Sequence, residues 1–234
     1  EFTFGLILGL SRKTFQASYH IKSNQDFHYD GFEGFNLQGK TLGIIGTGRI
    51  GQEVAKIAKG FEMNLLAFDA FPNAAAAAQL GFKYVTLREL LEQSDIVTLH
   101  VPYMKETHHL INMKNIEQFK KGAILINTAR GEIADTSAIL HGINERILSA
   151  VGLDVLEGER DLKDEMQIFA QDSNMHKEQL QTLLKDHILM QKPEVVITPH
   201  MAFFTKEAKV EIARITLENI TTFTSGQPKN IIKA

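Results

Sequence analysis

Residues 41–51 read Thr-Leu-Gly-Ile-Ile-Gly-Thr-Gly-Arg-Ile-Gly, and this stretch decides the fold. The apolar run Thr41–Ile45 predicts a strand, and the amphipathic run Ile50–Phe61 predicts a helix after it. The turn between them has the G-x-G-x-x-G spacing, formed by Gly46, Gly48 and Gly51. A glycine turn that connects a strand to a helix in this way predicts the first βαβ unit of a Rossmann-type domain.

Each glycine of this turn has its own physical role. Gly46 permits the tight turn, Gly48 lets the backbone approach a pyrophosphate, and Gly51 allows the helix to pack closely on the strand. The N-terminus of the helix also offers unpaired N–H groups to phosphate oxygens. We therefore expect a dinucleotide to bind here.

Asp69 indicates which dinucleotide it is. It follows the strand predicted over Leu65–Phe68, where a carboxylate accepts hydrogen bonds from the adenosine ribose. Neither Ala70 nor Phe71 is an arginine that would neutralise a 2′-phosphate. The sequence thus favours NAD over NADP.

Further short apolar runs alternate with amphipathic ones along the chain, which is typical of βαβ units around a parallel sheet. Crossovers of this length favour a doubly wound α/β fold. The other predicted strands are Ile96–His100, Ala123–Asn127, Ala150–Asp154 and Val195–Thr198, and the other predicted helices are Thr86–Gln93, Lys114–Phe119 and Thr136–Ile143. Thr86 with Glu89 predicts a capping box, and Asp135 or Thr136 is expected to cap the last helix.

Two regions depart from this rhythm. Residues 19–39 are polar, aromatic and punctuated by glycine, and we expect an irregular arm. Residues 160–191 form a long charged insertion, much of it expected as exposed helix. We assign residues 1–201 to the nucleotide-binding domain, with a helix and arm over 1–39, and residues 202–234 to a C-terminal segment of a second domain.

Composition excludes several classes of protein. The 234 residues carry a formal net charge of −3, so we expect no nucleic-acid partner. The absence of cysteine excludes disulfides and thiolate chemistry. The apolar start, Phe2–Leu10, is too short to cross a bilayer and is expected to be a helix buried against protein. Neither a secretory signal nor a membrane partner is indicated, and the cytoplasm is the expected compartment.

Three groups of different chemistry follow later predicted strands. They are Arg130 in Asn-Thr-Ala-Arg-Gly, Glu159 in Glu-Gly-Glu, and His200 in Thr-Pro-His. Doubly wound sheets place ligands at the carboxyl ends of their strands. Each residue alone is better explained as an ordinary surface or loop residue, and the order of all three is what predicts a site.

With the glycine turn, His100-Val101-Pro102 followed by Thr107, and Gly152-Leu153-Asp154-Val155, these motifs resemble the D-isomer-specific 2-hydroxyacid dehydrogenases, most of all the D-lactate dehydrogenase branch. The resemblance implies that His200 is the acid–base group, that Glu159 lies against its imidazole, and that Arg130 binds the substrate carboxylate. The implied reaction is hydride transfer between NAD and a small 2-oxo or D-2-hydroxy acid, without a metal.

The same resemblance assigns further residues to the cofactor and predicts a homodimer through the nucleotide-binding domain. The complete set of expected cofactor-binding residues is Gly46, Gly48, Arg49, Ile50, Gly51, Asp69, Val101, Pro102, Thr107, Thr128, Ala129, Arg130 and Asp154. Tyr103 and Phe203 are weaker pocket candidates, because an aromatic residue near a sheet is more often core.

The sequence departs from the family in two respects. Arg160 stands where many members have proline after the glutamate. The substrate-binding lobe with which family members begin is not present before Glu1. We therefore expect this chain to bind NAD and to turn over substrate poorly by itself, with an apolar face exposed.

Other classes of protein explain the motifs less well. No tyrosine has lysine four residues later, as a short-chain dehydrogenase requires, and an L-lactate or malate dehydrogenase places its histidine in another local setting. His108 and His109 are adjacent, so they do not form the His-Glu-x-x-His motif of a zinc hydrolase. The alternative that stays open is an NAD-responsive regulatory protein, similar to co-repressors built on this scaffold.

Overall fold

The computed structural model of the protein describes residues 1–159, 162 and 177–231. The chain forms two compact units, Glu1–Pro199 and His200–Ala234. The predicted boundary, after residue 201, falls close to this division. Most of the predicted site residues belong to the first unit.

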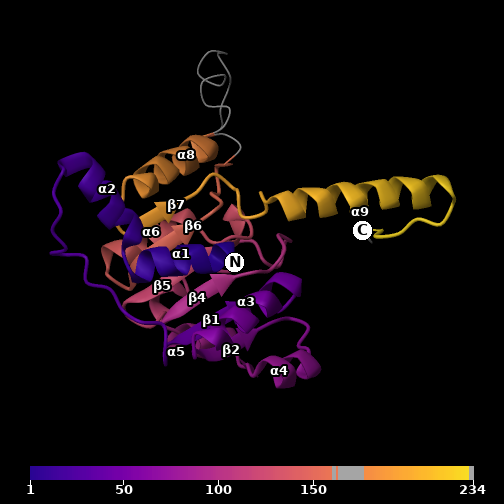
Figure 1. Ribbon diagram of the computed structural model, residues 1–234, viewed down its shortest axis with the longest axis horizontal. Coiled ribbons are helices and arrows are strands. Elements are labelled where there is room, and N and C mark those ends of the chain that lie inside the picture. The colour runs from indigo at the N-terminus through magenta and orange to yellow at the C-terminus, as the bar shows by residue number, and fades with distance from the viewer. Residues whose placement is uncertain (160–161, 163–176, 232–234) are drawn as a thin grey trace, which may run out of the picture. The chain divides into compact units, whose positions relative to one another are not determined.

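The first unit is built on a parallel sheet with seven strands among the described residues, in the order β3-β2-β1-β4-β5-β6-β7 (Figure 1). The strands are β1 Thr41–Ile45, β2 Asn64–Phe68, β3 Lys83–Tyr84, β4 Ile96–Leu99, β5 Ala123–Asn127, β6 Leu148–Leu153 and β7 Val195–Ile197. The chain moves outward from β1 to β3 and then returns to place β4 on the other side of β1. This reversal confirms the doubly wound fold and creates a switch point between β1 and β4, where ligands bind in such sheets.

Helices cover both faces of the sheet. Buried side chains of α1 (Phe2–Ser11), α3 (Arg49–Gly60) and α4 (Ala74–Leu80) form one core cluster with the strands. Those of α5 (Leu87–Gln93), α6 (Thr136–Asn144) and α8 (Lys177–Met190) form the other. The burial of both faces explains why the central strands are continuous apolar runs rather than alternating ones.

The caps predicted for two helices are confirmed. The Thr86 side chain accepts from the Glu89 N–H and the Glu89 carboxylate accepts from the Thr86 N–H, which completes the capping box of α5. The Asp135 carboxylate accepts from the Ser137 N–H at 2.8 Å and caps α6. These side chains satisfy N–H groups that the first turn of a helix leaves without a partner.

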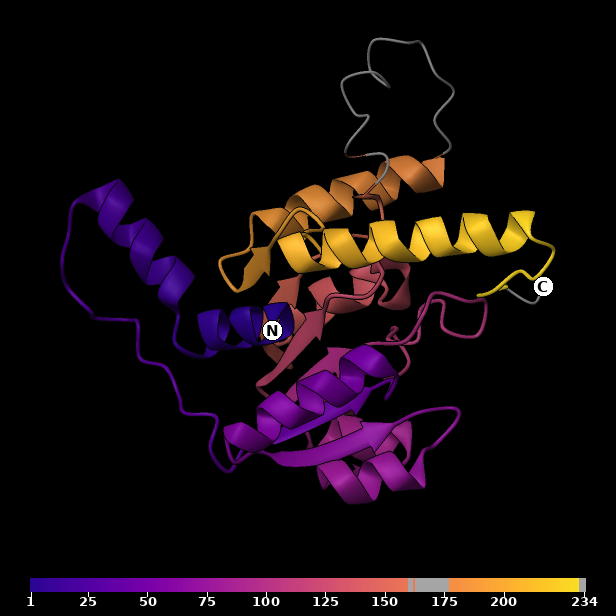
Figure 2. The same cartoon turned by 45° about the vertical axis from the view of Figure 1, so that its right-hand side comes forward.

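The N-terminal segment agrees with the sequence only in part. Helix α1 is buried as expected, but a second helix, α2 (Thr14–Asn24), occupies the start of the predicted arm. In Figure 2, α2 projects away from the sheet. It has no buried residue, so it lacks the apolar face by which a helix is recognised in a sequence.

One further expectation about an element is wrong. The helix predicted over Lys114–Phe119 is a single 3₁₀ turn, Ile116–Gln118. The Asn115 amide donates to Leu110 O at 2.8 Å, and its oxygen accepts from the Asn112 N–H at 2.9 Å, so this side chain holds a turn instead of a helix. Helix α8 confirms the helix expected in the insertion and is exposed over much of its surface, while Leu183, Asp186 and Leu189 on one face are buried. The rest of the predicted insertion, residues 160–161 and 163–176, lies outside the described residues.

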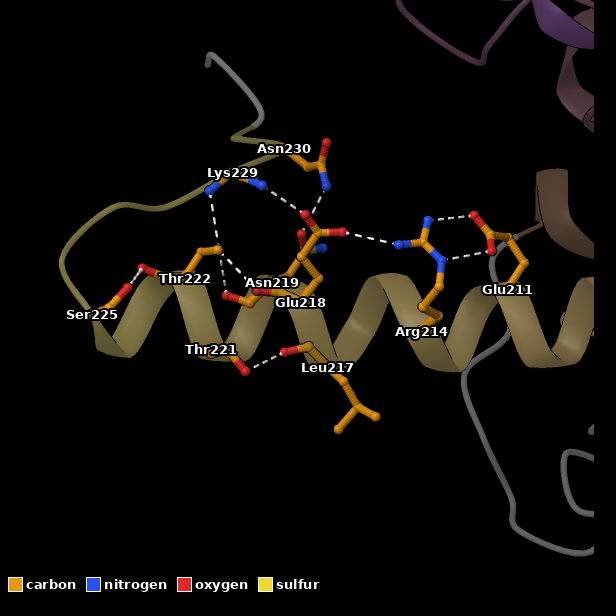
Figure 3. A network of polar contacts seen from close by, with 10 residues as sticks. All are labelled: Glu211, Arg214, Leu217, Glu218, Asn219, Thr221, Thr222, Ser225, Lys229 and Asn230. Atoms are coloured by element: carbon orange, nitrogen blue, oxygen red, sulfur yellow. Dashed lines mark hydrogen bonds and ion pairs between the residues drawn. The ribbon is translucent and has the colours of Figure 1, made fainter.

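The second unit consists of α9 (Lys206–Thr224) and the tail after it, drawn from close by in Figure 3. The guanidinium of Arg214 makes two hydrogen bonds to the Glu211 carboxylate, at 2.6 and 2.8 Å, and a third to Glu218 at 3.2 Å. Lys229 on the tail donates to the other Glu218 oxygen at 2.8 Å. This ion-pair chain runs along α9 and ties the tail to the helix.

Apolar side chains on α9 are exposed, among them Val210, Leu217 and Phe223. The helix has no buried residue. No described helix of the protein combines the length and the apolar character that a membrane crossing requires.

Candidate dinucleotide and substrate site

The glycine turn has the geometry that each glycine was predicted to provide. Gly46 has φ of 94°, in the left-handed region, and a Cβ there would lie 2.7 Å from the His100 carbonyl. A Cβ on Gly51 would lie 2.0 Å from Gly46 O, because α3 starts directly against the turn. A Cβ on Gly48 would meet nothing within 4 Å, so this backbone faces open space. Gly48 also caps α3 without a side-chain hydrogen bond, which leaves the helix N-terminus accessible to an anion.

Asp69 is bound to the same turn. Its Oδ2 accepts from Thr47 N at 2.6 Å and Thr47 Oγ1 at 2.8 Å, and its Oδ1 accepts from Phe71 N at 2.9 Å. Burial raises the pKa of this carboxyl, but the hydrogen bonds from Thr47 and Phe71 outweigh burial and the pKa falls below its usual value. Asp69 is therefore a carboxylate at neutral pH, with oxygens in position beside the turn.

A cleft of about 610 Å³ opens at the switch point of the sheet. Its walls come from the loops that follow β1, β4 and β5, three adjacent strands. The predicted cofactor residues in this wall are Gly48, Arg49, Ile50, Val101, Pro102, Thr128, Ala129 and Arg130. The structure thus brings together residues that lie up to 82 positions apart in the sequence, as the strand-end argument predicts.

His100 and Tyr103 also line the cleft; Tyr103 was a weaker pocket candidate from the sequence, and His100 was not among the predicted site residues. His100 Nε2 lies 2.9 Å from Thr98 Oγ1, and burial lowers the pKa of the imidazole to about 4. His100 is therefore a neutral wall of the cleft. The signal for both residues was their place next to Val101 and Pro102, directly after a buried strand.

Five predicted cofactor residues do not line the cleft: Gly46, Gly51 and Asp69, which belong to the glycine turn described above, and Thr107 and Asp154. Thr107 Oγ1 donates to Pro102 O at 2.7 Å and accepts from Met104 N at 2.8 Å, so it closes the loop that carries the cleft residues. Asp154 is buried at the end of β6, where Thr198 Oγ1 donates to its Oδ1 at 2.5 Å. The contacts of both residues support the strand ends around the cleft. Their direct contact with a cofactor stays a prediction.

Arg130 follows a turn that Asn127 organises. The Asn127 amide donates to Arg130 O at 2.8 Å and its oxygen accepts from Ala129 N at 3.0 Å. These two hydrogen bonds set the course of the backbone as it leaves β5. Arg130 itself is exposed, and its Nη1 donates to Ala129 O at 2.6 Å. Asn127 belongs to the motif but was not among the predicted site residues.

The loop of Glu159 lies against the loop of Arg130. A Cβ on Gly131 would lie 2.1 Å from Leu156 O and 2.5 Å from Glu157 N, so the two backbones are in direct contact. Glu159 N donates to Leu156 O at 3.3 Å, within the turn that ends this loop. Two of the three predicted catalytic residues therefore sit on adjacent, mutually packed loops of the first unit.

His200 opens the second compact unit. Its φ is 53°, in the left-handed region, and its ring contacts Phe203 edge to face at 5.9 Å between centroids. Its pairing with Glu159 and its approach to Arg130 stay predictions from the sequence.

His109, Asp135 and Glu157 form a group of possible metal ligands whose atoms lie within 4.8 Å of one another. Local structure accounts for these side chains. His109 Nε2 pairs with Glu157 Oε1 at 2.6 Å, Asp135 caps α6, and Glu157 Oε2 accepts from Thr136 Oγ1 at 3.0 Å. We assign the group to the attachment of the loop after β6, and the absence of a metal stays a prediction.

Comparison with known proteins gives the family of the chain. Residues 4–202 match the family model described as D-isomer specific 2-hydroxyacid dehydrogenase, NAD binding domain. The chain is 40% identical over 230 residues to a 2-hydroxyacid dehydrogenase homolog of Haemophilus influenzae, and 37% identical over 230 residues to the D-lactate dehydrogenase of Escherichia coli. In both alignments 97% of this chain is covered, but only 65% and 66% of the relatives, so the chain spans less than two thirds of their length.

A solved structure agrees with the sequence comparison. The D-lactate dehydrogenase from Aquifex aeolicus, complexed with NAD and lactic acid, matches with a TM-score of 0.85 at 35% identity, over 96% of this chain and 65% of the other. The family model is that of an NAD binding domain, in agreement with the cofactor predicted from the turn and Asp69. The residues matched by the family model include the glycine turn, Arg130 and Glu159. The chain belongs to the D-isomer specific 2-hydroxyacid dehydrogenases.

Proposed function

We propose that this chain is the cofactor-binding part of an NAD-dependent dehydrogenase that interconverts a small 2-oxo acid, such as pyruvate, and the D-2-hydroxy acid, such as D-lactate. The observation that carries the proposal is the cleft at the switch point, which has the open turn at Gly48 and the cation of Arg130 in one wall. Membership of the family supports the reaction class.

The residues present fit the cofactor. The open backbone at Gly48 and the N-terminus of α3, which no side chain caps, suit a pyrophosphate, and the ionised Asp69 suits ribose hydroxyls rather than a 2′-phosphate. When bound, NADH supplies the hydride. The chain's own residues bind and orient the substrate and move a proton.

In the proposed reaction, Arg130 binds the substrate carboxylate, because its planar fork of N–H donors matches two carboxylate oxygens. His200 donates a proton to the carbonyl oxygen during reduction and removes it in the reverse direction. Glu159, against the imidazole, favours its charged form and holds one tautomer. The packed loops at Gly131 keep Arg130 and Glu159 at a fixed spacing.

The experiment follows oxidation of NADH by pyruvate and by bulkier 2-oxo acids, in this chain and in an extended form that adds the substrate-binding lobe. We expect turnover in the extended form, and little in the chain alone. His200→Ala and Glu159→Gln should abolish most turnover, and Arg130→Lys should raise KM for the 2-oxo acid. His141→Ala is the matched control, since the side chain of His141, on α6, pairs with Glu117 of the 3₁₀ turn. An extended form that binds NADH but oxidises it with no 2-oxo acid contradicts the proposal and favours the regulatory protein.

We also propose that the protein is a homodimer that pairs through residues 1–39. Apolar side chains of this segment are exposed, most of all Phe27 and Tyr29, each at 87%. The segment returns to the domain at Leu37, which is buried, so the exposed part is a projection with both ends anchored. The cytoplasm remains the compartment predicted from the sequence.

A further inference from the structure

Helix α8 has an acidic residue on its buried face. The side chains of Leu183, Asp186 and Leu189 recur at every third position and are 2%, 0% and 0% exposed. In Figure 1 the helix lies beside α6, and the two are in contact. A carboxylate on an apolar stripe is costly to bury unless hydrogen bonds satisfy it, so its partners show what it is held against.

Asp186 joins three elements through its two oxygens. Its Oδ2 accepts from Gly158 N at 2.9 Å, on the loop that follows β6. Its Oδ1 accepts from Thr136 Oγ1, at the start of α6, at 3.3 Å. The Thr136 hydroxyl also lies 3.0 Å from Glu157 Oε2, so the hydroxyl is shared between two carboxylates.

The contact with Gly158 is as close as the backbone permits. A Cβ on Gly158 would lie 2.8 Å from Asp186 Oδ2 and 3.4 Å from Thr182 Cγ2. A Cβ at position 158 would therefore crowd the Asp186 oxygen that accepts this hydrogen bond. The hydrogen bond fixes the peptide between Glu157 and Gly158, and Glu159 is the next residue along the chain.

The groups around Asp186 shift the pKa of its carboxyl in both directions. Burial raises the pKa of Asp186 to about 6, and the nearby Glu157 raises it as well, while the hydrogen bonds from Gly158 and Thr136 and the charge of His187 act in the opposite direction. Glu157 is itself held by Thr136 and His109. The loop is thus held at Glu157 from one side and at Gly158 from the other.

We propose that Asp186 is a positioning residue for Glu159: it accepts the Gly158 N–H and thereby holds the Glu157-Gly158-Glu159 loop in the arrangement that places the Glu159 carboxylate for catalysis. This inference rests on the proposed function for the role of Glu159. The contact itself rests on the geometry of Asp186, Gly158 and Thr136 alone.

The test compares three variants in the extended form of the protein. Asp186→Ala leaves the Gly158 N–H without its partner, and we expect kcat to fall about 10- to 100-fold. The Kd of NADH should change less than about twofold, since Asp186 does not line the cleft. Asp186→Asn keeps an oxygen for Gly158 and directs an N–H to Thr136 Oγ1, so it should recover most of kcat. Leu189→Ala removes a buried side chain from the same helix face and controls for lost stability.

Two results would overturn the inference. One is an Asp186→Ala enzyme whose kcat matches that of Leu189→Ala at equal thermal stability. The other is hydrogen exchange at the Gly158 and Glu159 amides that Asp186→Ala leaves unchanged, where we expect exchange at least about tenfold faster. If the unmodified enzyme shows no turnover, the proposed function fails, and the exchange measurement still decides whether Asp186 holds the loop. If Glu159→Gln abolishes turnover and Asp186→Ala does not alter it, this inference alone fails.

Discussion

At the scale of single residues, the glycines near the cofactor turn differ in what a methyl group would meet. A Cβ on Gly51 would lie 2.0 Å from the backbone oxygen of Gly46, which has no freedom to move away. Gly51→Ala should therefore lower the free energy of unfolding by about 1–3 kcal/mol, a typical cost of overpacking, and should weaken NADH binding by distorting the turn. Urea unfolding and a calorimetric NADH titration measure the two effects.

Gly60→Ala is the control for this substitution. Gly60 lies at the other end of the same helix, and a Cβ there meets nothing within 4 Å. We expect unchanged binding and equal or slightly greater stability, because alanine favours a helix over glycine. Equal behaviour of the two variants would show that close packing at Gly51 is not what shapes the turn.

His100 should make stability depend on pH in a defined window. Its ordinary pKa is 6.5, and burial lowers it to about 4 in the folded protein. The folded state then binds a proton less readily than the unfolded state, so stability is lost as pH falls from 6.5 towards 4. His100→Gln should lose less stability over this range than the unmodified chain, as measured by urea unfolding at several pH values.

The comparison with His100→Gln is necessary because Asp186 acts in the opposite direction. Burial raises the pKa of Asp186 to about 6, so its contribution to stability increases as pH falls through 6. The difference between the two proteins isolates the histidine. A difference that does not change between neutral pH and pH 4 would contradict the lowered pKa of His100.

At the scale of elements, α1 covers β6 at a glycine. A Cβ on Gly152 would lie 2.9 Å from Ile126 Cδ1, 3.1 Å from Leu10 Cδ1 and 3.3 Å from Leu6 Cβ. Gly152→Val should push α1 away from the sheet and cost about 1–3 kcal/mol. Gly5→Ala, on the same helix where a Cβ meets nothing within 4 Å, should stabilise by up to about 1 kcal/mol. Thermal unfolding of the two variants measures both changes in stability. A Gly152→Val protein as stable as the unmodified chain would refute the packing of α1 on β6.

The elements that the sequence predicted well are those with a buried apolar run. Strands β1 and β5 have the predicted bounds, because every residue from Ala123 to Asn127 is buried and the turn chemistry on each side is unambiguous. Strand β3 was missed, because two residues are too few to show a period. Helix α2 was missed for another reason: its contacts with the rest of the unit bury none of its side chains, so no apolar stripe marks it.

The candidate site was predictable where chemistry is tied to a strand end. The residues at Gly48, Pro102 and Arg130 line one cleft as expected, because parallel strands end at the same edge of the sheet. Asn127 and Asp186 were not predicted, since both act through backbone groups brought close only by tertiary packing. The sequence contained one signal for Asp186, because this acidic residue lies on the leucine stripe of an amphipathic helix.

At the scale of the whole molecule, the exposed arm predicts a dimer. Replacement of Phe27 and Tyr29 together by aspartate puts charge into the proposed interface, and we expect a shift from dimer to monomer. Light scattering coupled to size exclusion should give twice the 26.2 kDa of the chain before the change and 26.2 kDa after it. Phe71→Asp, at a residue that is 85% exposed outside the arm, should leave the dimer intact. A chain that is monomeric before substitution refutes this interface.

We propose that the cleft at the switch point binds NAD and that the glycine turn and Asp69 determine this preference. The most direct measurement is a fluorescence titration of this chain with NADH and with NADPH, which is free of tryptophan background because the chain has no tryptophan. We predict saturable binding of one NADH per chain, much weaker binding of NADPH, and NADH affinity about 10- to 100-fold lower in Asp69→Ala, the worth of hydrogen bonds to a charged group. Absence of saturable NADH binding to the folded chain, or equal affinity for NADPH, would contradict the account.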